Sequence, residues 1–314
     1  MKRNWELEEL IEHFTFLPNE MQQIGNKSGE TRLGFAVLFK FFQYEARFPF
    51  HKFEVPKSVI QYIAKQIDAP AELYAQYDWV GRSITYHRTQ IRDFFGFRED
   101  TINDAEEVIA WLCKSVLFQD HEFEHLFETV YRRFRDMKVV PPTPDRIERL
   151  IRTSIRTYEE QFFQATLEKL PTASLSKLDS LIDSIAFLDE HQDGSSSDEG
   201  LLSFQELKAD PGKPGVESVL REVRKLRTIR SLELPDDLFR DIPLKVLTKY
   251  RQRTATEDLR ELRRHPDPIR YTLLAAFFWL RSMEITDNLM ELFIQIVHRI
   301  GVRAERKVEM IYAR

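Results

Sequence analysis

The chain has 314 residues, of which 42% are apolar and 31% charged, and its formal net charge is −5. This composition is typical of a globular protein with two or three domains. The single cysteine, Cys113, excludes an internal disulfide framework and fits a reducing compartment. The longest apolar run, YTLLAAFFWL, is too short to cross a membrane, and the basic N-terminus lacks the apolar segment of a secretory signal. We therefore expect a cytoplasmic protein without a membrane span.

Apolar residues recur at spacings of three and four, and strand-like alternation is rare, so an all-α fold is predicted. Residues 31–48 are apolar on nearly all sides, as in a central buried helix. Short helices are predicted to begin at Pro56 and Pro70, and a further helix at 83–95 with Ser83 as its N-cap and Gly96 as its stop. Later helices are predicted at about 102–118, 121–137, 144–169, 216–230, 243–262, 268–281 and 286–300.

The domain boundaries are predicted from turns and composition. The stretch DEHQDGSSSDEG, residues 189–200, is polar and rich in glycine and serine, which indicates a linker. The predicted organisation is a first helical module at 1–98, a second at 99–188, the linker at 189–200 and a helical connector at 201–314.

Charge is strongly segregated along the chain. Residues 99–128 hold nine acids against one base, a sum of −8, whereas residues 131–156 hold eight bases against three acids, a sum of +5. Residues 221–230 hold five bases against one acid, a sum of +4. Local basic surfaces are therefore expected on an acidic protein.

The stretch SITYHRTQIRDFF, residues 83–95, has two faces when it is placed on a helix. Its apolar residues lie on one face with His87 beside them. The other face and its flanks carry side chains that can reach base edges and phosphates in a major groove, and with the preceding Arg82 they are Thr85, Tyr86, Arg88, Thr89, Gln90 and Arg92. Two short predicted helices precede this one, so we predict a helix-turn-helix-like unit whose third helix contacts DNA. An ordinary solvated helix face is the alternative.

The turn GNKSGETRLG is a second candidate contact. Its glycine spacing is too short for a phosphate-binding loop of nucleotide-binding proteins, and Glu30 stands where such a loop needs lysine. Backbone amides at the start of the following helix, with Lys27, Ser28 and Arg32, could instead hold a DNA phosphate. A plain helix cap by Ser28 or Thr31 is the alternative, and both can hold.

A basic stripe is the third candidate. In RRFRDMKVVPPTPDRIERLIRTSIR, arginines recur at spacings of three and four on one helical face, and two of the three arginines that precede them are further candidates. The residues are Arg132, Arg133, Arg146, Arg149, Arg152 and Arg156. We expect them mainly to touch DNA phosphates. A solvated stripe that is balanced by the acidic helix before it is the alternative.

Signals for catalysis are weak. HEFEH (His121–His125) has the histidine spacing of zinc proteases, but Glu124 is charged where an apolar residue is needed and no third ligand follows. Cys113 has the apolar neighbours of a core residue. We predict no catalytic residue and no metal ligand in this chain.

Three stretches carry a family resemblance: FTFLPNEMQQIGNKSGETRLGFAVLFKFFQYEARFP, YDWVGRSITYHRTQIRDFFGFR and ELRRHPDPIRYTLLAAFFWLRSMEITDNLMELFIQIVHRIGVRAERKV. Together they cover about a third of the chain, and they resemble the N-terminal region of the Tn-three family of bacterial replicative transposases. The resemblance implies N-terminal helical domains that bind the terminal inverted repeats of a transposon. It also implies a later ribonuclease-H-like domain with an Asp, Asp, Glu triad, which this chain is expected to lack.

The resemblance therefore implies a chain that binds transposon ends as double-stranded DNA and needs no cofactor of its own. Magnesium is expected only in the catalytic domain outside this chain. A homodimer of the full-length protein and a location at the bacterial nucleoid are further expectations. The alternative class is a non-enzymatic helical scaffold whose basic stripes bind acidic protein partners. A metal-dependent hydrolase is a third option, which would require bound zinc.

Overall fold

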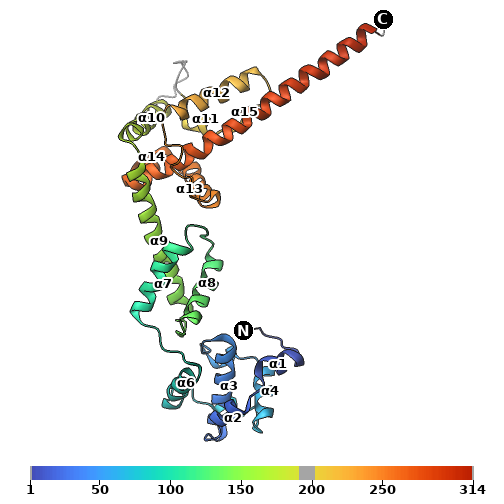
Figure 1. Ribbon diagram of the computed structural model, residues 1–314, viewed down its shortest axis with the longest axis vertical. Helices are drawn as coiled ribbons and strands as arrows, with labels where there is room; N and C mark the ends of the chain where they lie inside the picture. The colour runs from blue at the N-terminus through green and yellow to red at the C-terminus, as the bar shows by residue number, and fades with distance from the viewer. Residues whose placement is uncertain (1, 191–201, 313–314) are drawn as a thin grey trace. The chain divides into compact units, whose positions relative to one another are not determined.

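The computed structural model describes residues 2–190 and 202–312, and every regular element within these ranges is a helix (Figure 1). The one pairing of strand type in the described chain is an isolated bridge between Arg98 and Val139. The predicted all-α class is confirmed. None of the described helices is both long enough and apolar enough to span a membrane.

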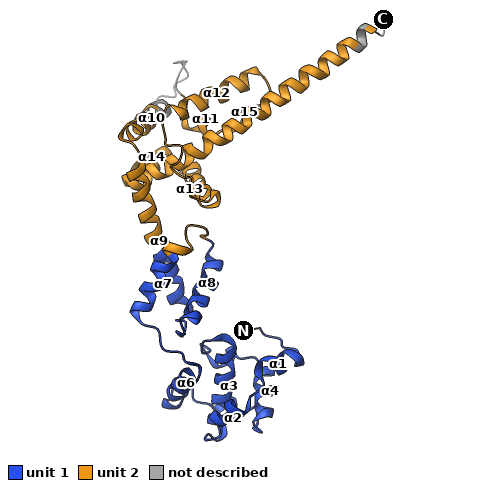
Figure 2. Cartoon of the chain, viewed as in Figure 1, with its two compact units in different colours: residues 1–112, 122–154 blue, residues 113–121, 155–314 orange. Residues whose placement is uncertain are grey.

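The chain forms two compact units (Figure 2). Unit 1 consists of residues 1–112 and 122–154, and unit 2 of residues 113–121 and 155–314. The predicted module at 99–188 lies partly in each unit. The first two residues of the predicted linker at 189–200 end helix α10 (Thr172–Glu190), and the others lie outside the described residues.

Unit 1 is built around helix α3 (Gly29–Glu45), whose residues 33–42 are all buried. This confirms the predicted central helix. It is surrounded because its apolar residues occupy every side, so that neighbours can pack on all of them. The helices in contact with it are α1 (Leu7–Phe14), α2 (Pro18–Ile24), α4 (Lys57–Gln66), α5 (Leu73–Gln76) and α6 (Arg82–Phe95).

The two ends of α6 are fixed by glycines. Gly96 has a φ of +69° and ends the helix as predicted. The predicted cap at Ser83 is wrong, because the helix begins earlier, with Gly81 at the N-cap position. Asp78 Oδ1 accepts hydrogen bonds from the amides of Val80 (2.9 Å) and Gly81 (3.0 Å), which forms the turn before the helix. A Cβ at Gly81 would lie 2.0 Å from Asp78 Oδ2, so a larger residue there would force the Asp78 side chain to move.

The rest of unit 1 consists of most of α7 (Ile102–Ser115), α8 (Phe123–Asp136) and the start of α9 (Pro144–Lys169). Arg133 on α8 donates to Glu107 on α7 over 3.0 Å. Backbone hydrogen bonds from Arg98 to Lys138 (3.0 Å) and from Val140 to Arg98 (2.9 Å) join the segment after α6 to the segment after α8. The two segments are thereby held side by side.

Unit 2 packs around the first part of α15 (Asp267–Tyr312), which contacts α10, α12 (Val216–Arg230) and α13 (Leu244–Thr256). The predicted helices at 268–281 and 286–300 are one helix, because no glycine or proline interrupts the backbone between them. The predicted helix at 243–262 is two helices, because Asp258 caps a new one, α14 (Leu259–Arg264), by accepting from the Glu261 amide over 2.7 Å. Unit 2 also contains α11 (Phe204–Lys208).

Candidate nucleic-acid interface

Helix α6 presents one exposed face from unit 1. Its apolar side is buried through Ile84, His87 and Ile91. The opposite side exposes Arg82, Thr85, Tyr86 and Thr89, and 68% of the Tyr86 surface is accessible. Arg88 and Arg92 are half-buried on one flank of this face, and Gln90 is half-buried on the other. Asp93 is exposed on the same side, so the face combines a cation, an acid, two hydroxyls and a phenol.

Contacts with α3 fix the rotation of α6. The Tyr77 hydroxyl and His87 Nδ1 lie 2.7 Å apart, and the Phe35 ring meets the His87 ring edge-on with centroids 5.1 Å apart. Gly34 allows Tyr77 to approach, because a Cβ there would lie 2.4 Å from the tyrosine ring. Burial, with a smaller effect of the nearby Lys27 charge, lowers the pKa of His87 to about 4. A neutral His87 therefore belongs to the folded state.

Folding should consequently become less favourable in acid. The unfolded chain takes up a proton at His87 near its usual pKa of 6.5, whereas the folded chain does so near 4. Stability from this residue is therefore complete above pH 6.5 and is lost as the pH falls towards 4, by up to about 3 kcal/mol. Urea unfolding at pH 7.5 and 4.5 should show a smaller acid loss for His87→Gln than for the wild type. His51→Gln, at an exposed position, is the control, and equal acid losses in all three proteins would contradict the assignment.

The turn before α3 is joined to α6. Lys27 Nζ donates to Gln90 Oε1 (3.0 Å) and to the Gln23 carbonyl (2.9 Å), and it lies 3.8 Å above the centre of the Phe35 ring. Ser28 is the N-cap residue of α3, and its hydroxyl makes no capping hydrogen bond. Arg32 is half-buried, and its Nε atom is buried without a hydrogen-bond partner. Two of the predicted contact regions therefore meet in space.

A groove of about 640 Å³ lies along the Arg88 flank of α6. Its other walls are the segment before the short helix at Lys52–Glu54, the connection after Gly96, the segment before α9 and the first turn of α9. The residues that line it are Arg47, Phe48, Pro49, Phe50, Thr85, Arg88, Arg92, Glu99, Asp100, Val140, Pro141, Pro142, Thr143 and Arg146. It therefore brings part of the predicted DNA-contacting helix together with the first arginine of the predicted basic stripe.

The arginines of this groove differ in their partners. Arg92 is paired with Glu99 and Arg146 with Asp100, each over 2.9 Å. Arg47 is buried and paired with Glu54. The Arg88 Nε atom is buried without a hydrogen-bond partner, no ion pair joins the Arg88 side chain to a described acid, and its guanidinium lies 5.3 Å from the centre of the Phe48 ring.

The other predicted arginines lie on α8 and α9. Arg132 is exposed, and Arg133 lies 5.2 Å from the Trp111 ring in addition to its contact with Glu107. On α9, Arg149 donates to the Asp145 carbonyl over 3.2 Å, and Arg152 is paired with Glu148 over 2.6 Å. Arg156, on the part of α9 in unit 2, lies 3.8 Å from Glu160. The arginines of the stripe that lie on α9 are thus exposed, and each has a partner within the chain.

Sequence reasoning missed Arg47, Glu99 and Asp100. Arg47 follows Ala46, which takes a left-handed conformation at the end of α3, and the sequence there indicates only an extended connector. Glu99 and Asp100 belong to the acidic run at 99–128 and look like solvated acids. Their pairing with Arg92 and Arg146 depends on long-range contacts, for which no local pattern gives a signal.

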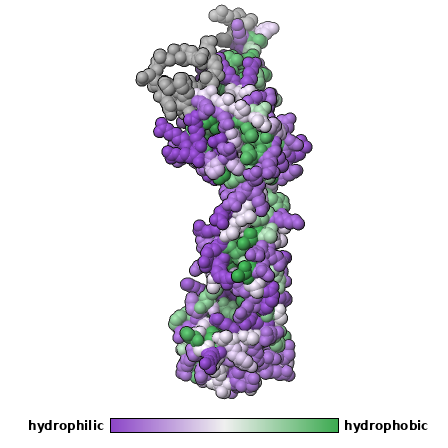
Figure 3. Space-filling model, turned by 90° about the vertical axis from the view of Figure 1, so that its left-hand side faces the viewer, coloured by the Kyte–Doolittle hydropathy of each residue, from purple (hydrophilic) through white to green (hydrophobic). Residues whose placement is uncertain are grey.

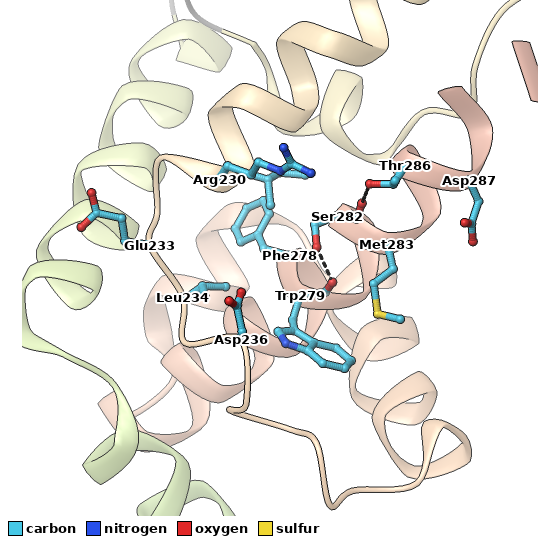
Figure 4. Close-up of a pocket in the computed structure, with 11 residues that line it drawn as sticks. Arg230, Glu233, Leu234, Asp236, Phe278, Trp279, Ser282, Met283, Thr286 and Asp287 are labelled. Carbon is cyan, nitrogen blue, oxygen red and sulfur yellow. Dashed lines mark hydrogen bonds between the residues drawn. The ribbon is translucent and has the colours of Figure 1, made fainter. Parts of the chain in front are cut away.

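A hollow of about 590 Å³ in unit 2 combines apolar and charged residues of α15 and of the chain around the end of α12 (Figure 4). The hydroxyls of Ser282 and Thr286 donate to carbonyls of their own helix, over 2.8 and 2.7 Å. Glu233 is paired with Lys177 over 2.7 Å. The hydroxyls of Ser282 and Thr286 and the Glu233 carboxylate therefore already have partners within the protein.

The histidines of HEFEH do not share a helix, because α8 begins at Phe123 and His121 precedes it. His121 lies with Nε2 2.6 Å from the Leu117 carbonyl and Nδ1 3.2 Å from Lys249 Nζ. Among the described residues, no group of three or more histidine, cysteine or acidic side chains is arranged to hold a metal ion.

Most of the surface visible in Figure 3 is hydrophilic, with apolar residues in separate patches.

Comparison with known proteins supports the resemblance. A domain of unknown function, DUF4158, matches residues 1–154. The transposase for transposon Tn1546 of Enterococcus faecium is 24% identical over 281 residues, which are 89% of this chain and 27% of that protein. The transposases for Tn3926 of Escherichia coli and Tn501 of Pseudomonas aeruginosa are 22% and 23% identical, each over 96% of this chain and 29% of their own length. The chain thus spans less than a third of the length of these relatives. Over nearly its whole length, the chain is therefore similar to part of the transposases of these bacterial transposons.

Proposed function

We propose that this chain binds the terminal inverted repeats of a transposon, as the DNA-recognition part of a replicative transposase. The observation that carries the proposal is the exposed face of α6, with Arg82, Thr85, Tyr86 and Thr89, on a helix whose rotation is fixed by buried contacts with α3. A relative of the chain is named as a transposase, which suggests a role in transposition. On this proposal, the exposed face of α6 is the surface that contacts DNA.

The dimensions of α6 suit a major groove. Its 14 residues give a length of about 21 Å, and a major groove about 12 Å wide admits a helix. Arginine can donate two hydrogen bonds to guanine, and threonine can donate to or accept from several bases. The arginines on α9 would neutralise phosphates beside this contact and contribute affinity without sequence preference.

Catalysis is assigned to the part of the relatives that this chain does not span. Phosphoryl transfer with divalent ions needs carboxylates that converge on the metal. On this proposal magnesium belongs to that other part, and the chain needs no cofactor to bind DNA. A homodimer of the full-length protein at the bacterial nucleoid accords with the same proposal.

The experiment is a selection of bound duplexes from a pool with a randomised 40-base-pair segment, followed by gel-shift titration of the enriched duplex and of a scrambled version. We expect one motif to be enriched, to match the ends of the element that encodes the chain, and to bind at least about 10³-fold more tightly than the scrambled duplex. Equal affinity for both duplexes would contradict sequence-specific recognition. Absence of DNA binding, with capture of acidic proteins instead, would favour the scaffold alternative.

A further inference from the structure

Arg88 is a half-buried cation that no described acidic side chain neutralises. Its Nε atom is buried without a partner. Burial lowers its pKa, with Tyr77 acting in the opposite direction and Arg92 in the same one. Removing a charge from water is costly unless an opposite charge compensates for it. The side chain therefore occupies a position that an anionic ligand would stabilise.

Three further guanidinium groups line the same groove. Arg47 is paired with Glu54, whereas Arg92 and Arg146 are each held by an acid on the connection after Gly96. One side chain of each pair is open to water, Glu99 (73% exposed) and Arg146 (49%), whereas Arg92 (14%) and Asp100 (20%) are mostly covered. Water competes for the exposed charge of each pair, which weakens the pair. A stronger acceptor can therefore replace the carboxylates.

We propose that this groove binds a phosphate of the nucleic-acid backbone, with Arg88 as its fixed donor and Arg92 and Arg146 as donors that Glu99 and Asp100 occupy in the free protein. This rests on the proposed function and names the backbone contact that belongs to it. Guanidinium groups match phosphate oxygens in paired hydrogen bonds. Thr85 lies both on the exposed face of α6 and in the groove wall, so backbone next to a base contact of α6 would pass this groove.

Glu99 and Asp100 therefore act as internal competitors of the phosphate. When DNA binds, each carboxylate has to leave its arginine. The loss of this ion pair reduces the free energy gained from the contact between that arginine and the phosphate. Removal of one carboxylate should consequently strengthen binding, whereas loss of Arg88 should weaken it. Both effects should be equal on all sequences, because phosphates carry no sequence information.

The test compares wild type, Glu99→Gln, Asp100→Asn and Arg88→Gln by fluorescence anisotropy on a 30-base-pair random duplex across 50–200 mM salt. We expect Glu99→Gln and Asp100→Asn each to raise affinity about three- to eightfold and to steepen the salt slope by up to about 0.9. Arg88→Gln should lower affinity and reduce the slope by about 0.9. The control is Glu106→Gln on α7, which removes one exposed negative charge outside the groove.

Equal effects of Glu99→Gln, Asp100→Asn and Glu106→Gln would overturn the inference and leave sequence-specific binding by α6 untouched. A second measurement follows the Arg88 Nε–Hε signal by NMR during titration with inorganic pyrophosphate, with the signal assigned by its loss in Arg88→Gln. A shift supports the anion site even if the chain binds no duplex, which would refute the proposed function alone. An unchanged signal at saturating pyrophosphate refutes the site.

Discussion

Replacing Lys40 with methionine should lower the free energy of unfolding of unit 1 by about 3–5 kcal/mol. Lys40 Nζ lies 2.6 Å from Glu20 Oε2, and the two side chains are only 2% and 3% exposed. Lys40 also donates to the Thr15 carbonyl (2.6 Å) and to Gln43 (2.7 Å). Without the lysine, Glu20 is a buried charge with no cation. Urea unfolding followed by tryptophan fluorescence in a Trp279→Phe background, where every remaining tryptophan is in unit 1, measures the change.

The matched control is the double variant Glu20→Gln with Lys40→Met, which removes both charges. It should recover much of the loss, because an amide can still accept from the Leu17 backbone amide, which now bonds to Glu20 over 2.9 Å. A loss below about 1 kcal/mol for Lys40→Met alone would show that Glu20 reaches water or another cation. The pair would then not be a buried determinant of this fold.

Alanine at four of the exposed positions of α6 should abolish most of the preference for the selected duplex over a scrambled one. The expected loss is about 10³-fold or more, because each base contact contributes about 1–3 kcal/mol. The positions are Arg82, Thr85, Tyr86 and Thr89. Alanine favours the helix and these side chains are exposed, so circular dichroism should show an unchanged fold. Gel-shift titrations on both duplexes measure the ratio of affinities.

A matched variant carries alanine at Lys57, Gln61 and Lys65, which are exposed on α4 of the same unit. It changes the net charge at least as much as the α6 variant and should leave the affinity ratio intact. If both variants reduce binding equally on both duplexes, the α6 face contributes general electrostatics and not base recognition.

Much of the fold could be predicted from local pattern. The helices at 144–169 and 216–230 have the predicted bounds, and α3 is buried because apolar residues occupy all its sides. Helix ends that depend on side-chain contacts were harder to predict. The N-cap of α6 is Gly81 and not Ser83, because Asp78 forms the preceding turn. Helix α15 is continuous because no glycine or proline stands between the two helices predicted for it.

Some features of the candidate site could likewise be predicted from local pattern, and others could not. The two faces of α6 follow from a period of 3.6 residues, which is a local property. The groove depends on Phe48, Asp100 and Arg146 meeting across long sequence separations, and periodicity carries no information about that. The contact of Lys27 with Gln90 is likewise a tertiary one, so a residue that was predicted to face DNA also joins two helices.

We propose that α6 lies in a major groove of its target DNA. Dimethyl sulfate methylates guanine N7, an acceptor in the major groove, so methylation interference on the selected duplex tests the claim directly. We expect methylation of guanines within one short stretch to block wild-type binding, and this interference to disappear in the variant with alanine at Arg82, Thr85, Tyr86 and Thr89. Interference that is confined to minor-groove positions, or a guanine pattern that persists unchanged in the variant, would contradict it.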